Sequence, residues 1–577
     1  MKWVRSMLST KISLAEKIHS AFVSSFPENH PEKDEILSLL TSPPDKAMGD
    51  LAMPCFKFAK LLRTSPVNIS NTLAQSLQNI DGIKVESVNG YLNVFIDRNA
   101  FFKKTVEKIL TQKENYGKTN EGQGKTIVLD YSSPNVAKPF HVGHLGTTVI
   151  GHSLKKLFEA AGYNCIGVNH LGDWGTQFGK LIVAYKKWGN EKKVEEGGID
   201  ELVALYVKFH EEAEKDPSLS DEARAQFAAL ERKEPEQIAL WEKFIDISIK
   251  EYKQTYEQLG IEFDYYTGES FYSDKMPAVI EEMKEKNLLT LNEGASVVEL
   301  EEYGMPPCLI LKTDGATLYP TRDISAALYR KKTFDFHKCI YVTSAAQSLH
   351  FAQWFRVMAL MGYDWYEDLV HVPYGTVSIN GEKLATRTGN VVLLKDLFAN
   401  ATEKAADIMA EKNPALAGNK ETAEAVGIGA VIFYYLSANK IRDINFIMKD
   451  ALNFDGNTGP YAQYTYARTC SIASKAEEMG IKPTISGDVC EDEFTLIKTL
   501  SIFPDVISDA IKEYEPSVIT RYILDICADF NRFYHNCQIL SSEDEETKAR
   551  RLALTICTKY TLASALELIC MKHPEKI

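Results

Sequence analysis

The sequence contains no apolar run near the roughly 20 residues needed to span a bilayer, and no repeat or low-complexity tract. We therefore expect no membrane partner. Its cysteines stand singly, without a C-x-x-C pair, which argues against a disulfide framework and against a cysteine-rich zinc site. We expect most of them to be buried as small apolar side chains, and we predict no protein-held metal.

Acidic residues are missing before Glu16, so a targeting peptide is one interpretation of this basic start. The segment lacks a continuous apolar core and a small-residue cleavage pattern, which favours an amphipathic helix and a cytoplasmic protein. The whole chain carries a formal net charge of −14. This balance argues against a DNA-coating protein, but it describes only the average field and is compatible with a basic track for one RNA.

The chain has 577 residues, too many for one hydrophobic core, so several domains are expected. Residues 1–118 alternate helical patterns with short strands, and the run 90–96 (GYLNVFI) is typical of a half-buried strand. These patterns predict an N-terminal α+β domain followed by a polar linker over 111–124.

The next segment has the pattern of a parallel sheet. A short strand over 126–129, a loop with two prolines, a helix over 145–161 and a strand over 164–168 form a βαβ unit. Another apolar strand is expected over 338–342. The predicted fold class is α/β, with a Rossmann-type, doubly wound parallel domain over 119–400.

Two helical regions complete this organisation. A charged, mainly helical stretch near 180–286 is predicted to be an insertion between the two halves of the parallel domain. After it, segments such as 458–479 and 548–571 repeat apolar residues at the helical period. Residues 401–577 are therefore predicted to form an all-α helical bundle domain.

A candidate anion site lies where the first strand leads into the helix. His141 and His144 stand at a helix N-terminus, where free N–H groups and the helix dipole favour an anion. Gly143 would let a base or a phosphate approach the backbone, and Lys138 adds a positive charge. These residues suit a triphosphate attacked at its α-phosphorus. The alternative is one capping histidine and one that faces solvent.

The full motif consists of Pro134, Asn135, Val136, Ala137, Lys138, Pro139, Phe140, His141, Val142, Gly143 and His144. A second motif, 170–179 (HLGDWGTQFG), follows the second strand at the edge where parallel sheets bind ligands. Its glycines permit a tight loop beside a ligand, and a purely structural turn is the alternative.

Two further segments are candidates for binding. The glycine-flanked loop 380–390 (NGEKLATRTGN) carries Lys383 and Arg387, which could close over phosphates, although an exposed basic hairpin is the favoured interpretation of the pattern alone. The tyrosine-rich segment 461–468 follows a Gly- and Asn-rich turn and could present rings to unstacked RNA bases. Core tyrosines of a helical bundle are the alternative there.

Residues 132–144 resemble the HIGH signature of the class I aminoacyl-tRNA synthetases, and the flank SSPNVAKPF resembles the arginyl branch. The resemblance covers essentially the whole chain. Residues 170–179 are similar to a loop of the ATP and amino-acid site, and 531–537 resemble part of the anticodon-binding domain. Residues 1–118 resemble the N-terminal module that contacts the outer corner of tRNA.

The resemblance implies roles for individual residues. Three residues would be catalytic: His141, His144 and Lys138. ATP would be bound by the two histidines together with Gly143, Gly172, Asp173, Lys383 and Arg387. The tRNA would be contacted by Tyr461 and Tyr534.

A guanidinium group has five donors and no acceptor, so its pocket needs acids and planar acceptors. The resemblance implies such an arginine pocket from Asp130, Asn135, Tyr319, Asp323 and Gln347. For each acid taken alone, a surface or capping role is the favoured interpretation. Two acids would exclude neutral amino acids, because these would leave buried charges unpaired, so no editing site is expected.

The resemblance is incomplete at two places. The segment KLATR stands where the class carries KMSKS, with Thr386 in place of the second lysine. Arginyl enzymes often use a lysine just upstream of HIGH instead, and Lys138 holds that position. The chain ends in Ile577 where the family has methionine, which leaves that anticodon contact open.

The implied reaction is ATP-dependent attachment of L-arginine to the 3′ end of its tRNA through an arginyl-adenylate, with release of AMP and pyrophosphate. It would require bound tRNA and Mg²⁺ on the phosphates, without zinc or an organic prosthetic group, in a monomer. Two alternatives remain. The cysteinyl enzyme would need a zinc-binding cysteine set, and a non-catalytic RNA-binding descendant would not need the intact HVGH and Lys138.

Overall fold

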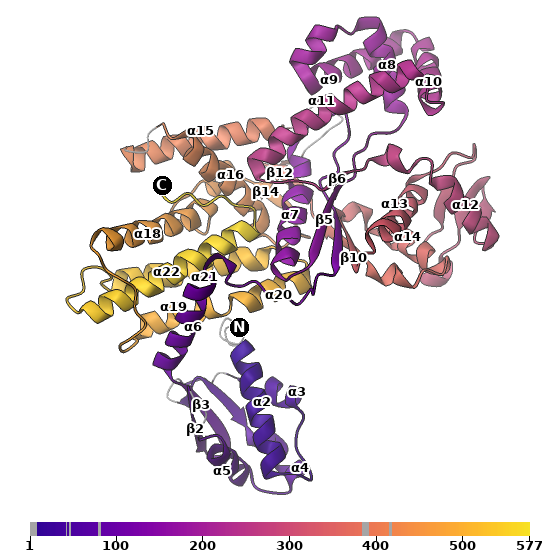
Figure 1. Cartoon of the computed structure of the whole chain (residues 1–577). Coiled ribbons are helices and arrows are strands. Elements are labelled where there is room, and N and C mark those ends of the chain that lie inside the picture. Colours follow the sequence, from indigo (N-terminus) through magenta and orange to yellow (C-terminus); the bar gives the residue numbers. More distant parts are fainter. Residues whose placement is uncertain (1–7, 42, 46–47, 79–81, 384–391, 415–417) are drawn as a thin grey trace.

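The computed structural model describes residues 8–41, 43–45, 48–78, 82–383, 392–414 and 418–577. In Figure 1 a central parallel sheet lies between the C-terminal helices on one side and a lobe containing α12–α14 on the other, while the insertion helices and the N-terminal part project from opposite ends. Within these described ranges, no helix combines the length and apolar character needed to cross a membrane.

The N-terminal part pairs helices with a small antiparallel sheet of order β1-β3-β2. The predicted strand is β3 (Tyr91–Ile96), whose inward residues are buried. The remaining elements are α2 (Leu8–Ser25), α3 (Lys33–Leu39), β1 (Leu51–Pro54), η2 (Cys55–Phe58), α4 (Ala59–Leu62), α5 (Pro66–Ser76) and β2 (Ile83–Val88). Ser65 caps α5 and Pro66 begins it, as residue types favoured at these two positions do.

The stretch expected as a polar linker is packed against the C-terminal helices. It begins inside α6 (Arg98–Gln112) and continues through η3 (Lys113–Asn115). Tyr116 is buried and its hydroxyl donates to the Leu500 carbonyl at 2.9 Å. At Gly117 a side chain would meet the Phe503 ring. Because residues 111–124 are mostly polar, the sequence did not indicate that Tyr116 and Gly117 pack against these helices.

The parallel sheet has the order β11-β10-β4-β5-β6. Every neighbouring pair in it is parallel, and α7 (Leu145–Ala160) connects β4 to β5, as the sequence pattern predicted. β4 is buried along most of its length because helices cover a parallel sheet on both faces. The strands are β4 (Thr126–Asp130), β5 (Asn164–Asn169), β6 (Tyr265–Tyr266), β10 (Lys338–Ser344) and β11 (Leu369–Tyr374).

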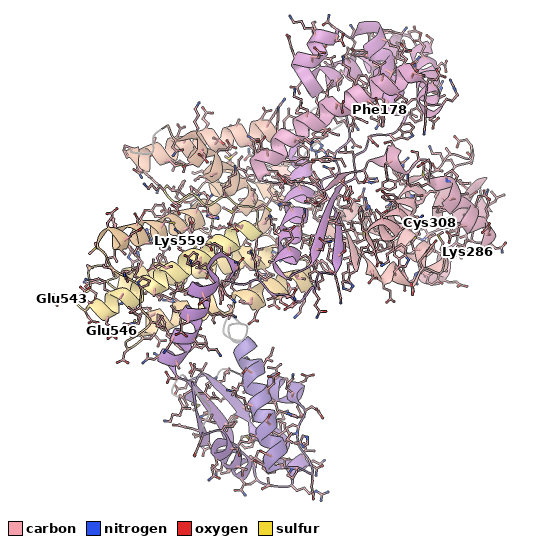
Figure 2. All side chains as sticks on the ribbon, viewed as in Figure 1. Phe178, Lys286, Cys308, Glu543, Glu546 and Lys559 are labelled. Atoms are coloured by element: carbon pink, nitrogen blue, oxygen red, sulfur yellow. The ribbon has the colours of Figure 1, made fainter. Side chains whose placement is uncertain are left out.

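Four helices leave the sheet after β5 and form the insertion: α8 (Thr176–Trp188), α9 (Glu191–Lys215), α10 (Ser218–Glu231) and α11 (Pro235–Leu259). The chain then returns to the sheet through β6, inside the range expected to be helical. A two-residue strand has no periodicity for the sequence to reveal. Figure 2 marks this insertion with Phe178, which lies on α8.

A second lobe follows β6, and Cys308 marks it in Figure 2. It contains an antiparallel sheet of order β7-β8-β9, which the sequence did not predict. Its elements are η5 (Glu269–Tyr272), α12 (Met276–Glu285), β7 (Thr290–Asn292), β8 (Ala295–Val298), η6 (Glu301–Tyr303), β9 (Cys308–Leu311), α13 (Tyr319–Phe334), η7 (Ala345–Gln347), α14 (Ser348–Leu360) and η8 (Asp364–Asp368).

The C-terminal part is helical, which confirms the predicted fold class. A small sheet of order β13-β12-β14 joins it to the end of the parallel domain. The elements are β12 (Val377–Ile379), β13 (Glu382–Lys383), α15 (Leu394–Lys412), α16 (Lys420–Ser437), β14 (Ile444–Phe446), α17 (Met448–Ala451), α18 (Gly459–Glu478), α19 (Glu491–Ser501), α20 (Phe503–Glu513), α21 (Ser517–Asn536) and α22 (Glu545–Leu568). The cysteines are free thiols and most are buried, as expected.

Candidate functional site

The loop between β4 and α7 contains strained backbone. Ser132, Ser133 and Ala137 have φ angles of 71°, 50° and 57°, in the left-handed region that non-glycine residues avoid. Such conformations persist only where their surroundings fix them. Here the Ser132 N–H donates to the Thr147 hydroxyl at 3.0 Å, and the hydroxyls of Ser132 and Tyr256 are 2.7 Å apart.

Insertion helix α11 supports the same loop from outside the sheet. The Tyr252 hydroxyl lies within hydrogen-bond distance of two carbonyls, those of Asn135 at 2.7 Å and Lys138 at 2.8 Å. One turn earlier, the Ser248 hydroxyl accepts the Ala137 N–H at 2.9 Å. The backbone of the motif is thereby fixed, while the side chains of Asn135 and Lys138 remain exposed.

Backbone pairing joins the first motif to the second. Val136 N–H donates to the Gly172 carbonyl at 3.1 Å, and Gly172 N–H donates to the Pro134 carbonyl at 3.1 Å. A side chain at Gly172 would overlap the Asn135 amide oxygen. The two motifs, which lie on separate loops, therefore form one unit at the carboxyl edge of β4 and β5.

Backbone pairing also joins the first motif to the chain that follows the KLATR loop. Val142 N–H donates to the Val392 carbonyl at 3.0 Å, and Leu394 N–H donates to the Phe140 carbonyl at 3.0 Å. The chain that is described again from Val392, beyond the predicted basic loop, is thus anchored beside HVGH. Lys383 lies on β13 at the upstream end, whereas Arg387 falls outside the described residues.

The two histidines of HVGH lie with their ring centroids 3.9 Å apart. His141 Nδ1 accepts the Gly143 N–H at 3.0 Å, and His144 Nδ1 accepts the His141 N–H at 3.2 Å. Burial lowers the pKa of His141, and burial together with His141 lowers the pKa of His144 to about 3. Both rings are therefore neutral at pH 7. Because each Nδ1 is an acceptor, each proton resides on Nε2.

In this arrangement the histidines both cap the turn and keep donors for an anion, the two roles that the sequence left open. The Nδ1 atoms cap the turn, and the two Nε2–H groups are the donors that a ligand can use. Neutral donors held beside an exposed lysine suit a polyanion, because they bind phosphate oxygens without being titrated near neutral pH.

A cleft of about 1340 Å³ opens between the insertion helices and the N-terminal end of α13. Asp173 and Tyr319 line it. Asp173 is buried, and its carboxylate accepts the Ser270 N–H at 2.8 Å and the Ser270 hydroxyl at 2.6 Å. Burial raises the pKa of Asp173. Its observed contacts thus hold the turn at Ser270 in the cleft wall.

Three residues of the predicted arginine pocket gather where α13 and α14 begin. Tyr319 is 65% exposed at the start of α13, and Asp323 lies one turn further along the same face. Asp323 Oδ2 lies 2.5 Å from His350 Nε2. Gln347 lies one turn before His350 and is exposed. His350 could not be selected from the sequence, because only the fold brings it to Asp323.

Asp130 differs from the free acid that the sequence suggested. Its Oδ2 lies 2.7 Å from Nη2 of Arg330, whose side chain is only 1% exposed. Its Oδ1 accepts the Ser133 hydroxyl at 3.0 Å. A guanidinium from the protein itself therefore neutralises Asp130.

Glu269 is an additional acid that the sequence interpretation missed. It lies in the cleft wall, mostly buried, and forms an ion pair with Arg322 at 2.8 Å. Burial raises the pKa of Glu269 to about 7; Arg322 opposes this shift, and the charges of Asp173 and Asp323 reinforce it. It lies just after β6, at the carboxyl edge of the sheet, and it was missed because that two-residue strand has no pattern in the sequence.

The predicted tRNA-binding tyrosines belong to one cluster between α18 and α21. Asn531 donates to the Tyr461 hydroxyl at 2.8 Å and accepts from Arg468 at 2.5 Å. The Arg468 guanidinium lies 5.1 Å from the Tyr464 ring centroid and 4.8 Å from that of Tyr534. These two rings are 41% and 40% exposed. They offer flat faces to unstacked bases.

Three family models match the chain. They are described as "tRNA synthetases class I (R), catalytic domain" over 105–448, "DALR anticodon binding domain" over 462–577 and "Arginyl tRNA synthetase N terminal domain" over 9–96. The domain that contains the parallel sheet, with HVGH at the carboxyl edge of that sheet, is thus the catalytic domain of a class I aminoacyl-tRNA synthetase.

Curated relatives narrow this class. The chain is 50% identical to an arginine–tRNA ligase of Alkaliphilus metalliredigens, over 94% of this chain and 96% of the relative. It is 49% identical to that of Clostridium beijerinckii, over 95% and 97%. The chain belongs to the arginyl-tRNA synthetase family.

Two solved structures have the same fold. Thermus thermophilus arginyl-tRNA synthetase superposes with a TM-score of 0.79 at 24% identity, covering 98% of this chain and 99% of that one. Arginyl-tRNA synthetase from Plasmodium falciparum superposes with a TM-score of 0.75 at 25% identity, covering 98% of both chains.

Gly172→Ala tests the pairing of the first two motifs. The added methyl group would displace the Asn135 amide, so we expect ATP–pyrophosphate exchange to fall by about 100-fold, the effect of a misplaced reacting group. The thermal midpoint of unfolding is the control and should fall by only a few degrees. Exchange within twofold of the unsubstituted protein would contradict the conclusion that the two motifs act as one unit.

Proposed function

We propose that this chain attaches L-arginine to the 3′ end of its tRNA in two steps at HVGH. The observation that carries the proposal is the pair of neutral imidazoles, His141 and His144, whose Nε2–H donors lie beside Lys138 at the ligand-binding edge of the sheet. Family membership supports arginine as the amino acid.

In the first step, the arginine carboxylate attacks the α-phosphorus of ATP, and pyrophosphate leaves as the arginyl-adenylate forms. Negative charge develops on the phosphoryl oxygens, and preplaced donors lower the barrier because they need no reorganisation. His141, His144 and Lys138 are the proposed donors. ATP enters as its magnesium complex, in which the metal neutralises the phosphates.

In the second step, the terminal adenosine of the tRNA attacks the activated carbonyl through its 2′-hydroxyl, and AMP leaves. Neither step needs a covalent intermediate on the protein. The contribution of the protein is to hold the reacting groups in line and to stabilise charge.

The proposed ATP site includes the backbone at Gly143, which has no side chain to obstruct a base or a phosphate. It also includes Gly172, where the Asn135 amide occupies the place of a side chain. Asp173 contributes by fixing the turn at Ser270 in the cleft wall. Lys383 and Arg387 remain proposed phosphate contacts. The support for them is that residues 392–394, which follow this loop, pair with Phe140 and Val142.

For the arginine pocket we propose Asn135, Tyr319, Asp323 and Gln347, to which the buried Glu269 is added. Asp130 contributes through Arg330 and Ser133, which hold the end of β4, rather than by pairing with the substrate.

For the tRNA we propose contacts at Tyr461 and Tyr534, in the cluster where exposed rings surround Arg468. We further propose three functional divisions, an N-terminal tRNA-contacting domain (1–118), a catalytic domain with its helical insertion near 180–286 (119–400) and an anticodon-binding domain (401–577). The protein is proposed to act as a monomer in the cytoplasm.

ATP–pyrophosphate exchange decides the proposed activity. We expect exchange that depends on both arginine and tRNA for arginine. Absence of exchange under every condition would contradict catalysis and favour an RNA-binding descendant. Exchange driven by cysteine or lysine would contradict the amino-acid assignment.

Neutralising the two aspartates should separate their roles. Asp323→Asn should raise the KM for arginine by at least tenfold, because it removes a charge from the pocket, with little change in the unfolding temperature. Asp130→Asn should mainly lower that temperature, because it leaves the buried Arg330 unpaired. Steady-state charging and thermal unfolding of both variants measure this. The reverse pattern would contradict the assignment.

Glu269 should make arginine binding depend on pH. Its pKa of about 7 means that it ionises between roughly pH 6 and 8, and the ionised form attracts a guanidinium. The KM for arginine should therefore fall as pH rises through 7. Glu269→Gln should have a higher KM and lack this dependence. A pH profile shared by the variant and the unsubstituted protein would assign the titration to another group.

A further inference from the structure

The hairpin formed by β12 and β13 is paired with a strand from the C-terminal part. β12 and β14 are parallel, with Ser378 opposite Asn445 in the register. The Asn445 side chain then reaches over the turn of the hairpin. Its Oδ1 accepts the Gly381 N–H at 2.7 Å and the Ser378 hydroxyl at 3.3 Å. One side chain therefore holds both the strand and the turn.

A second side chain fixes the start of the hairpin. Asp443 Oδ1 accepts both the Thr376 N–H at 2.7 Å and the Thr376 hydroxyl at 2.8 Å. Next to it, Gly375 lies so close to the Arg442 backbone that no side chain would fit. The hairpin thus has little freedom to move independently of the segment 442–446.

The chain just before that segment is in turn held at Lys440 by residues at the junction of α20 and α21. The buried carboxylate of Glu515 accepts the Lys440 N–H at 3.3 Å and the Ser517 N–H at 3.3 Å. The Lys440 ammonium donates to the Glu513 carbonyl at 3.0 Å. The far end of the 20-residue helix α21, about 30 Å away, carries Tyr534 of the tyrosine cluster. Figure 1 shows α21 running within the helical bundle.

The C-terminal helices also contact the HVGH turn directly. The hydroxyl of the buried Tyr435, on α16, donates to the Val142 carbonyl at 3.4 Å. The α16 contact therefore connects the bundle to HVGH through described residues. The anchored hairpin ends at Lys383, and the chain is described again from Val392, whose carbonyl pairs with Val142.

We propose that Asn445 is a positioning residue for adenylate formation, and that it transmits the state of the anticodon-binding surface to the catalytic motif. This inference rests on the proposed function. Asn445 touches no substrate; it acts by holding the β12–β13 hairpin in the register set by α21 and β14. The hairpin then holds one end of the chain that pairs with HVGH.

Three variants test the positioning role. Asn445→Ala removes the acceptor, and we expect a kcat for charging about three- to tenfold lower, with the KM for arginine unchanged, as for loss of one or two hydrogen bonds. Asn445→Asp retains an acceptor for Gly381 and Ser378 and should recover most of the kcat. Asn439→Ala is the matched control, because Asn439 is exposed and bonds only locally to Ile441.

A double-mutant cycle, which combines Asn445→Ala with a changed anticodon, tests whether Asn445 transmits anticodon binding to the catalytic motif. The unsubstituted protein and Asn445→Ala are each assayed with tRNA for arginine and with the same tRNA carrying a changed anticodon. If Asn445 transmits anticodon binding, the anticodon change should reduce kcat less in Asn445→Ala than in the unsubstituted protein. Equal reductions in both would overturn the transmission.

Other outcomes are equally decisive. Equal losses of kcat in Asn445→Ala and Asn445→Asp, or a loss that follows a lowered unfolding temperature, would overturn the positioning role. Absence of arginine-dependent exchange in the unsubstituted protein would instead contradict the proposed function. The two failures are therefore distinguishable.

Discussion

The motif 134–144 is a loop that ends in the short 3-10 helix η4 (Val142–His144), and its conformation depends on backbone hydrogen bonds to two neighbouring segments. Gly172 pairs with it on one side, and the segment 392–394 pairs with it on the other. Its left-handed residues would relax without these contacts and those from α11. Because the loop leads into α7, its position fixes the two histidines and the lysine together.

Charge in the site is arranged by the protein before any ligand binds. Burial keeps both histidines neutral, so they are donors of fixed tautomer. Arg330 neutralises Asp130, whereas Glu269 lies in the wall of the cleft and Asp323 lies one turn after Tyr319, which also lines it. Asp323 lies against His350 and Glu269 is paired with Arg322, so a bound guanidinium would compete with these partners, whereas a neutral competitor would bring no charge to do so.

Local patterns predicted the βαβ unit and the long helices, because the apolar periodicity of a helix or a buried strand is visible among residues close together in the sequence. The two-residue strand β6 and the β7–β9 sheet were missed because their pairing is set by distant parts of the chain. The same holds within the site. Ser270 as partner of Asp173, Arg330 as partner of Asp130 and the placement of Glu269 all depend on tertiary contacts. The histidines were identifiable because their spacing and helix start are local.

Hydrogen exchange at individual amides tests the central claim most directly. The N–H groups of Val136, Val142, Gly172 and Leu394 carry the pairing that holds the catalytic loop. In the unliganded protein we predict that they exchange slowly, as slowly as the amides of β4, because the loop is organised before substrates bind. Exchange at the rate of exposed loops, slowed only when ATP, arginine and tRNA are added, would contradict this account.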